Sequence, residues 1–294
     1  MRLYIIGNGF DIRHGLPTGY RHFKSYVEEH DKKLYEAIEE YLPAGDEWND
    51  LESALGEIDY DSILDNCEMF LVSYSAEDWS DAFHHDYQYE VDKITRLLSE
   101  RLKEIFTDWV KGIDITIAHT PTQYIPPIPM ESLYFSFNYT NTLQQIYSIP
   151  ESHITHIHGN CGYDEDIKLG HGFKIDESLN PYAGPDQDTR IAEAYDNINE
   201  YFGTTFKPVE DIIKEEIEYF SSLKNVYEVF VLGHSLAEVD GEYFAKINKS
   251  IQENARWVIA LYKDEIKSGS LDDYGINASN IYFVQYEDET LKRK

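Results

Sequence analysis

Six short runs of apolar, β-branched and aromatic residues are spaced along the chain, and each has the length of a buried strand. The first run, Leu3 to Ile6, is apolar at every position and ends at Gly7, which is typical of a strand buried on both faces in a parallel sheet. The other five runs are Leu133 to Phe137, Ile154 to Ile157, Val229 to Leu232, Trp257 to Leu261 and Ile281 to Val284. We therefore expect a sheet of about six strands with the first strand in its middle.

Segments with helical spacing lie between the later strands. They are Thr140 to Tyr147, Thr189 to Leu223 and Glu238 to Gln252. Strands that alternate with helices favour an α/β fold, Rossmann-like and doubly wound, with a mostly parallel sheet. The segment from Gly159 to Pro185 is rich in Gly, Asp and Asn, and we expect it to be a loop near the functional site.

A long charged stretch separates the first strand from the second. From Thr18 to about Trp109 the apolar residues recur at helical spacing, and the proline-rich run HTPTQYIPPIPMES follows. Prolines exclude both a helix and a central strand from that run. We expect a Rossmann-like domain made of residues 1–17 and 131–294, and a helical insertion over residues 18–130 that ends in the proline-rich return loop.

Charge and cysteine content narrow the class of protein. The 294 residues include 25 Lys and Arg against 55 Asp and Glu, a formal net charge of −30. Such a surface repels phosphate backbones and anionic lipids, so neither nucleic acid nor a membrane is expected as a partner. Two cysteines without a CxxC motif, and no run of 18 apolar residues, predict a cytoplasmic protein without a disulfide framework.

Two strand-to-helix turns contain glycines. In GNGFDIRHGLPTGY the third glycine is Gly15, so the spacing departs from the dinucleotide fingerprint GxGxxG, and the segment suits either an anion cradle or a tight turn. In GHSLA, Gly233 and Ser235 suggest a nucleophile elbow, but the histidine of such a triad must follow the serine, and His234 is the last histidine of the chain. We expect the second turn to be an anion cradle as well.

Polar residues end the second and third strands. Thr140 or Asn141 could cap the following helix. Asn138 is unfavourable inside a strand unless its amide has partners, so it is either a site residue or part of the scaffold. His156 and His158 are two positions apart and point to one face of their strand. His158 suits a general base, or a metal ligand together with His153, His156 or His171. No HExxH motif supports a metal, and none is predicted.

The segments IGNGFD with GLPT, FNYT, IHG and GHS with a following Asp resemble the bacteriophage abortive-infection AbiH family, in which they occur in this order. The resemblance extends from Ile6 to Asp240. It implies antiviral defence by abortive infection. That family in turn resembles sirtuin-like NAD-binding domains: the sirtuin pattern GAGxSxxSGIP aligns with GNGFDIRHGLP, TQNID with Ser136 to Thr140, the active-site HG with His158 and Gly159, and GTSL with GHSL.

This resemblance implies an enzyme that binds NAD and hydrolyses the bond between nicotinamide and ribose. The catalytic residues would then be Asn138 and His158. The residues that bind NAD would be Gly7, Asn8, Gly9, Asp11, Gly15, Gly233, Ser235 and Asp240. The chain departs from the sirtuin pattern at Asp11 and Thr140, which replace a Ser and an Asp, and it lacks the four zinc cysteines. A deacylase that grips a peptide between two domains is therefore not expected.

Two alternatives stay open. One is a non-catalytic module that binds NAD or ADP-ribose, which the acidic Asp11 favours. The other is a metal-dependent nucleotide hydrolase that uses His156, His158 and His171. In each case the expected partner is a small nucleotide, and the sequence leaves open a homo-oligomer and a phage-derived trigger.

Overall fold

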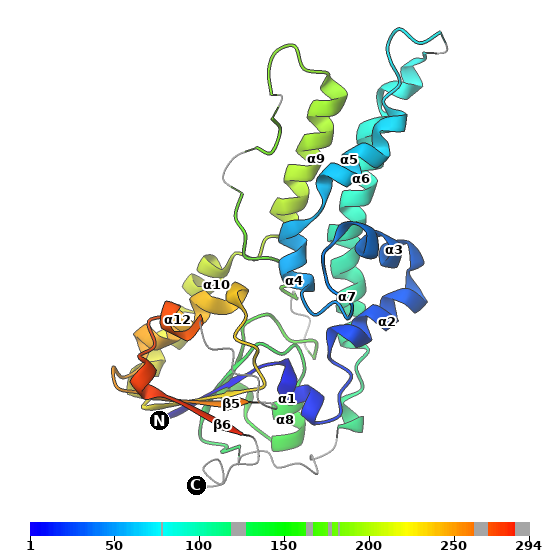
Figure 1. The fold of residues 1–294 in the computed structure, drawn as a ribbon. Helices are drawn as coiled ribbons and strands as arrows, with labels where there is room; N and C mark the ends of the chain where they lie inside the picture. The colour runs from blue at the N-terminus through cyan, green and yellow to red at the C-terminus, as the bar shows by residue number, and fades with distance from the viewer. Residues whose placement is uncertain are drawn as a thin grey trace. The chain divides into compact units, whose positions relative to one another are not determined.

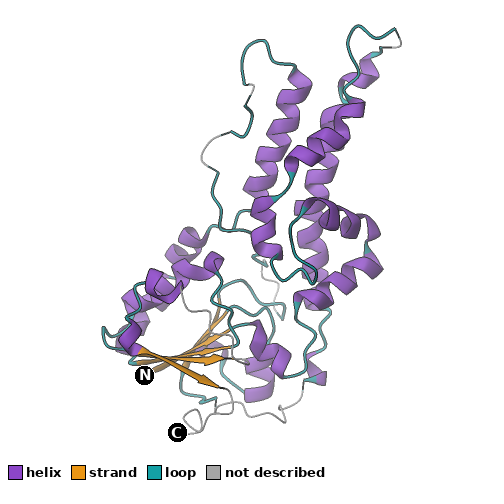
Figure 2. Ribbon diagram, viewed as in Figure 1, coloured by secondary structure: helices purple, strands orange, loops and turns teal. Residues whose placement is uncertain are grey.

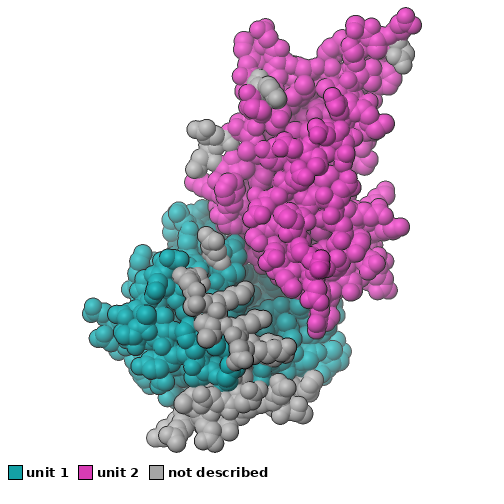
Figure 3. Space-filling view, in the orientation of Figure 1, with its two compact units in different colours: residues 1–19, 109–168, 208–294 teal, residues 20–108, 169–207 magenta. Residues whose placement is uncertain are grey.

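A computed structural model describes residues 1–77, 79–118, 128–162, 167–175, 178–181, 183–261 and 270–285. The chain forms two compact units, which Figure 3 colours separately. The sheet unit contains residues 1–19, 109–168 and 208–294, and the helical unit contains residues 20–108 and 169–207. Most of the proline-rich run, residues 119–127, lies outside the described part of the chain.

The sheet unit is built on six parallel strands in the order β3-β2-β1-β4-β5-β6. Figure 2 shows the strands in orange. The strands are β1 Arg2–Ile6, β2 Leu133–Ser136, β3 Ile154–His156, β4 Glu228–Leu232, β5 Arg256–Leu261 and β6 Ile281–Gln285. All six expected strands are present, and β1 lies in the middle as predicted. The α/β fold with a Rossmann-like parallel sheet is thereby confirmed.

The pairing register brings the ends of four strands level with one another. Ile6 pairs with Ser136 on one side and with Leu232 on the other, and Ser136 pairs with His156. Because all the strands are parallel, the turns that follow β1, β2, β3 and β4 leave the sheet at the same edge. In open α/β sheets this carboxyl edge is where ligands bind.

Helices cover both faces of the sheet (Figure 1), so the strands are apolar on both sides. One face packs on α10 Val209–Glu215, α11 Ile217–Ser222, α12 Gly241–Ser250 and α13 Ser270–Asp273. The other face packs on α1 Asn8–Arg13 and α8 Thr142–Tyr147. In β1, Leu3 and Ile5 face the first group, while Tyr4 and Ile6 face the second. Full burial of one such side chain contributes about 1.5–3 kcal/mol to stability.

The helical unit is organised around the packing of α6 against α9. Its helices are α2 Tyr20–His30, α3 Lys32–Tyr41, α4 Leu51–Ala54, α5 Tyr60–Cys67, α6 Asp86–Arg96, most of α7 Leu102–Lys111, and α9 Thr189–Thr205. A π-helical turn, Leu97–Arg101, connects α6 to α7. Across the described residues, no helix is both long enough and apolar enough to cross a membrane.

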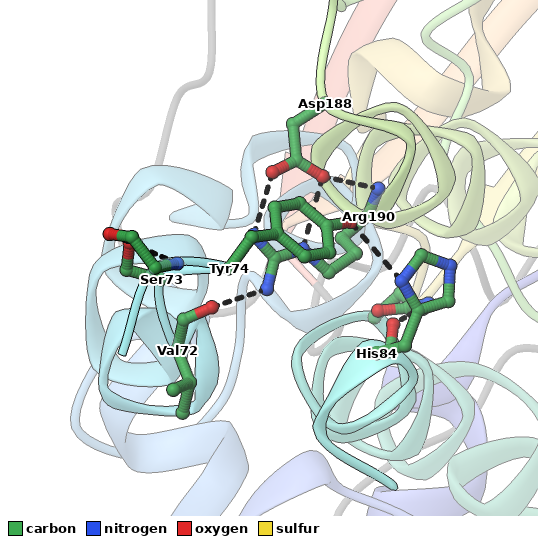
Figure 4. A network of polar contacts seen from close by, with 8 residues as sticks. Val72, Ser73, Tyr74, His84, Asp188 and Arg190 are labelled. Atoms are coloured by element: carbon green, nitrogen blue, oxygen red, sulfur yellow. Dashed lines mark hydrogen bonds and ion pairs between the residues drawn. The ribbon is translucent and has the colours of Figure 1, made fainter. Parts of the chain in front are cut away.

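One buried arginine fixes the start of α9 (Figure 4). The Arg190 guanidinium donates to both carboxylate oxygens of Asp188, at 3.1 and 2.7 Å, and to the carbonyl oxygen of Val72 at 2.7 Å. Its carbon lies 4.1 Å from the centre of the Tyr74 ring, and the Tyr74 hydroxyl lies 3.1 Å from Nδ1 of His84. These contacts, which we call the arginine clasp, connect residues 72–84 to α9.

The structure departs from the sequence expectations in two helical regions. The segment expected to be helical, Thr189 to Leu223, is three helices. Pro208 separates α9 from α10, because proline lacks an N–H and keeps Lys207 out of the helical conformation. The helix expected near Thr18 begins at Tyr20, and α1 precedes it directly after β1. The compact units place residues 169–207 in the helical unit and residues 109–168 in the sheet unit, and the expected domain boundaries stay a prediction.

Candidate functional site

The turns after β1 and β4 contact each other backbone to backbone. The Gly7 N–H donates to the carbonyl oxygen of Leu232 at 3.0 Å, and the Gly9 N–H donates to that of Gly233 at 2.8 Å. A Cβ atom on Gly7 would lie 2.5 Å from Cα of His234, and one on Gly9 would lie 2.9 Å from the oxygen of Gly233. The glycines thus allow the two turns to pack directly together, and their N–H groups donate the hydrogen bonds that join the turns. Phosphate binding by this turn stays a prediction.

A buried carboxylate lies next to this contact. Asp11, in α1, is 1% exposed and accepts a hydrogen bond on Oδ2 from the Thr140 hydroxyl, which is 3.1 Å from the Thr142 hydroxyl. Burial raises the pKa of Asp11 to about 6, although the side chains of Thr140, Thr142 and Asn138 act to lower it. Its Oδ1 is buried without a hydrogen-bond partner among the described residues. This atom therefore has capacity for one more donor.

The backbone of Asn138 is held from two sides while its amide is not. His156 Nδ1 lies 2.9 Å from the Asn138 carbonyl oxygen, and because a carbonyl oxygen can only accept, the ring proton is on Nδ1. The Ser136 hydroxyl accepts from the Asn138 N–H at 3.2 Å. The side chain is 6% exposed, and within the described part of the chain neither amide atom has a hydrogen bond of ordinary length, although the amide lies close enough to Asp11 to lower the pKa of that carboxyl. A buried amide in this state points to a ligand or an ordered water.

A second buried asparagine follows β3. The Cys161 N–H donates to the Tyr139 carbonyl oxygen at 2.8 Å, which places this segment beside the one that follows β2. Asn160 is 1% exposed, and its Oδ1 accepts from the Gly162 N–H at 2.8 Å, so its Nδ2 is a donor. That Nδ2 is also without a hydrogen-bond partner among the described residues. Burial, and then the charge of Asp11, raise the pKa of Cys161 to about 11, so this thiol stays protonated near neutral pH.

Two histidines lie on either side of one carboxylate. Nδ1 of His234 accepts the Leu236 N–H at 2.8 Å, so the ring proton is on Nε2, which lies 3.3 Å from Oδ2 of Asp240. The other oxygen of Asp240 lies 3.7 Å from Nε2 of His158. All three side chains are buried, and the Phe137 ring packs against both imidazoles, with centroid distances of 5.3 and 4.2 Å.

Most of the residues singled out from the sequence meet at this edge of the sheet. The turns with Gly7, Asn138, His158 and Gly233 all follow strands whose ends are level. Two others have roles within the loop after β1: Gly15 has a φ of +78°, and the Asn8 side chain donates to the Thr18 carbonyl oxygen at 2.9 Å. Ser235, in the turn after β4, is exposed. Sequence reasoning missed Asn160 and the roles of Thr142 and His234. The position of Asn160, two residues after His158 at a strand end, was an available signal.

The histidines of the metal-dependent alternative are divided between the two units. His171 belongs to the helical unit, where its ring packs against Gly56 and its Nδ1 accepts from the Phe173 N–H at 3.1 Å. His156 and His158 belong to the sheet unit. Within the residues that the structure describes, no group of three or more His, Cys, Asp or Glu side chains is arranged to hold a metal ion.

Comparison with known proteins gives one match. A sequence model of the family described as Bacteriophage abortive infection AbiH matches residues 3–261, a range that contains the whole site. Neither the curated proteins nor the solved structures contain a significant match.

Proposed function

Since the chain belongs to the bacteriophage abortive infection AbiH family, we propose that it is an abortive-infection effector that binds NAD and hydrolyses its bond between nicotinamide and ribose. The likeness of four segments to sirtuin motifs is what suggests NAD among the nucleotides. The position of the site, at the carboxyl edge of a parallel sheet, is where such folds bind dinucleotides. The alternatives of a binding module and of a metal-dependent hydrolase are outcomes of the experiment below.

The observation that carries the proposal is the amide of Asn138. It is buried, its backbone is fixed by His156 and Ser136, and both of its polar atoms have hydrogen-bond capacity left over among the described residues. Polar groups in this state are expected to bind water or the hydroxyl groups of a ligand. In the proposed reaction the Asn138 amide orients the attacking water against the ribose.

The chemistry needs charge stabilisation and one proton acceptor. The C1′–N bond to nicotinamide breaks through a cation-like sugar, the oxygen of water bonds to C1′, and the proton of that water passes to His158. The products are nicotinamide and ADP-ribose. Asp11, close enough to Asn138 for the amide to lower its pKa, adds negative charge near the developing cation when it is ionised. A positioned base and a buried carboxylate are therefore contributed by different strand-end turns.

The test is release of nicotinamide from NAD by the purified full-length chain, with and without a chelator. We expect turnover that is insensitive to the chelator, and a loss of about 10²–10⁴-fold in His158→Ala and Asn138→Ala. Asp272→Asn, an exposed aspartate of the same unit, is the matched control and retains activity. Melting temperatures on the same preparations separate lost chemistry from lost folding.

Three results would contradict the proposal. If His158→Ala lowers stability by about 1–3 kcal/mol and leaves turnover per folded molecule unchanged, His158 is a core residue and not a base. If wild-type protein binds NAD or ADP-ribose in calorimetry but releases no nicotinamide, the chain is a binding module. If the chelator abolishes turnover, the metal-dependent alternative takes its place.

A further inference from the structure

The turn after β4 is held in a conformation that few sequences adopt. Gly233 has a φ of +71° and Leu236 a φ of +59°, and a left-handed conformation is unfavourable for leucine. The Nδ1 of His234 accepts the Leu236 N–H across this turn at 2.8 Å. The bond fixes the imidazole in one orientation and one tautomer, with its proton on Nε2. His234 is thereby a neutral donor whose free direction is toward Asp240.

Asp240 is in turn oriented by that donor. Its Oδ2 faces the Nε2 proton of His234 at 3.3 Å, and its Oδ1 faces Nε2 of His158 at 3.7 Å. The Asp240 side chain is 11% exposed and the two imidazoles are 5% and 4% exposed, so water screens this charge weakly. A carboxylate at this distance favours a protonated imidazole at His158.

We propose that Asp240 is a positioning residue for His158, and that His234 holds Asp240 in place for that role. The inference rests on the proposed function, in which His158 accepts the proton of the attacking water. The Nε2 of His158 is turned toward Asp240, and the carboxylate stabilises the imidazolium that forms when the ring accepts a proton. Asp240 then acts through His158, and does not bind the nucleotide as the sequence motif suggested.

Among the described residues, two further titratable side chains pack on the His158 ring. Tyr139, in the segment after β2, has its ring centre 6.3 Å from that of His158, and Tyr243, in α12, has its ring centre 5.7 Å away. Phenols are neutral at pH 7, so of these described neighbours Asp240 is the one that can carry a negative charge. We therefore assign to Asp240 the electrostatic effect on His158, with His234 contributing orientation.

The first measurement is the titration of the His158 ring by NMR in the full-length protein, assigned by the resonance that His158→Gln removes. We expect Asp240→Asn to lower the midpoint of His158 by about one unit or more. Under NAD turnover, the acidic limb of the kcat profile moves down with it, and kcat falls by about tenfold or more while KM changes little. The control Asp272→Asn moves neither quantity.

The second measurement separates the two contacts of His234, the hydrogen bond from the Leu236 N–H and the approach to Asp240. Glutamine places an amide nitrogen near the position of Nε2 and keeps a donor for Asp240, while asparagine places an oxygen near Nδ1 and keeps the acceptor for the Leu236 N–H. Our proposal expects His234→Gln to retain more activity and a more nearly wild-type His158 midpoint than His234→Asn. If His234 only stabilises the turn, His234→Asn should retain more activity than His234→Gln.

The proposal is overturned if Asp240→Asn leaves the His158 midpoint unchanged, or if His234→Asn outperforms His234→Gln. The NMR midpoint does not depend on turnover. If wild-type protein does not cleave NAD, the proposed function fails, while the midpoint still decides whether Asp240 acts on His158. Melting temperatures of each variant exclude unfolding as the cause of a shift.

Discussion

Glycine has opposite roles at two positions of this chain. At Gly9 the absence of a side chain is required, because the backbone of Gly233 occupies the space that a Cβ atom would take. At Gly203, inside α9, nothing lies within 4 Å of the corresponding position. The residue type alone therefore does not indicate whether a glycine is needed; the neighbouring backbone does.

This difference gives a paired prediction. We expect Gly9→Ala to destabilise the protein by about 1–3 kcal/mol, since the added methyl group overlaps a carbonyl that cannot move freely. We expect Gly203→Ala to stabilise it by about 0.5–1 kcal/mol through the better helix propensity of alanine. Urea denaturation measures both. Equal effects of the two substitutions would mean that the contact between the turns is looser than the structure has it.

Asp11 makes the stability of the folded protein depend on pH. Its pKa of about 6 in the folded protein exceeds the ordinary 3.8, so between these values the folded state binds more protons than the unfolded state. Its contribution to stability is complete below about pH 4 and is lost as the pH rises through 6. Relative to Asp11→Asn, we expect the wild-type protein to lose about 1–2 kcal/mol of unfolding free energy from pH 5 to pH 8. A difference that is flat with pH would contradict the burial of this charge; Asp272→Asn serves as the reference variant.

Asn138 and His158 could be identified from the sequence more readily than the contacts of Asp11 and His234. Asn138 and His158 stand out because a polar residue at a strand end is unusual, and that is a local signal. The bond between Thr140 and Asp11 joins positions 129 residues apart, and no periodicity encodes it. The tautomer of His234 depends on a left-handed leucine two residues later, which propensity does not predict.

At the scale of elements, strands were easier to predict than helix boundaries. Each strand is a short apolar run buried on both faces, so its pattern is strong over its full length. Helix α1 begins with Asn-Gly, residues that disfavour helices, and forms because the turn contact with β4 fixes its start. Residues 169–207 belong to the helical unit because α9 packs on α6. The amphipathic pattern of α9 shows that one face is buried, but it does not show against which element that face packs.

The arginine clasp is the element-scale feature most open to test. Lysine at position 190 keeps the charge but cannot make the paired bonds to Asp188 or lie flat on Tyr74. We expect Arg190→Lys to cost about 1–3 kcal/mol and to speed hydrogen exchange over residues 72–84 in preference to the strands. Arg96→Lys alters an ion pair whose arginine is 56% exposed and should stay within about 0.5 kcal/mol of wild type. Unchanged exchange in residues 72–84 would show that the clasp does not hold them.

For the whole molecule, charge is the dominant property. A formal charge of −30 on 294 residues means that acidic groups repel one another in the compact state. We expect the melting temperature to rise as NaCl increases from about 10 to 300 mM, because the screening length falls below about 10 Å. A zwitterionic solute at the same osmolarity is the control. A melting temperature that is independent of salt would mean that ion pairs already balance the repulsion.

The central place of β1 in the sheet has a consequence during synthesis on the ribosome. Ile6 can pair with its neighbours only after Ser136 and Leu232 have been synthesised. Asp240 is synthesised later still. A nascent or prematurely terminated chain that ends between residues 208 and 232 therefore contains the first strand and the helical unit, but no turn after β4 against which the glycines could pack. Under the proposed function we therefore expect incomplete translation products to be inactive, because they lack the turn after β4 and Asp240.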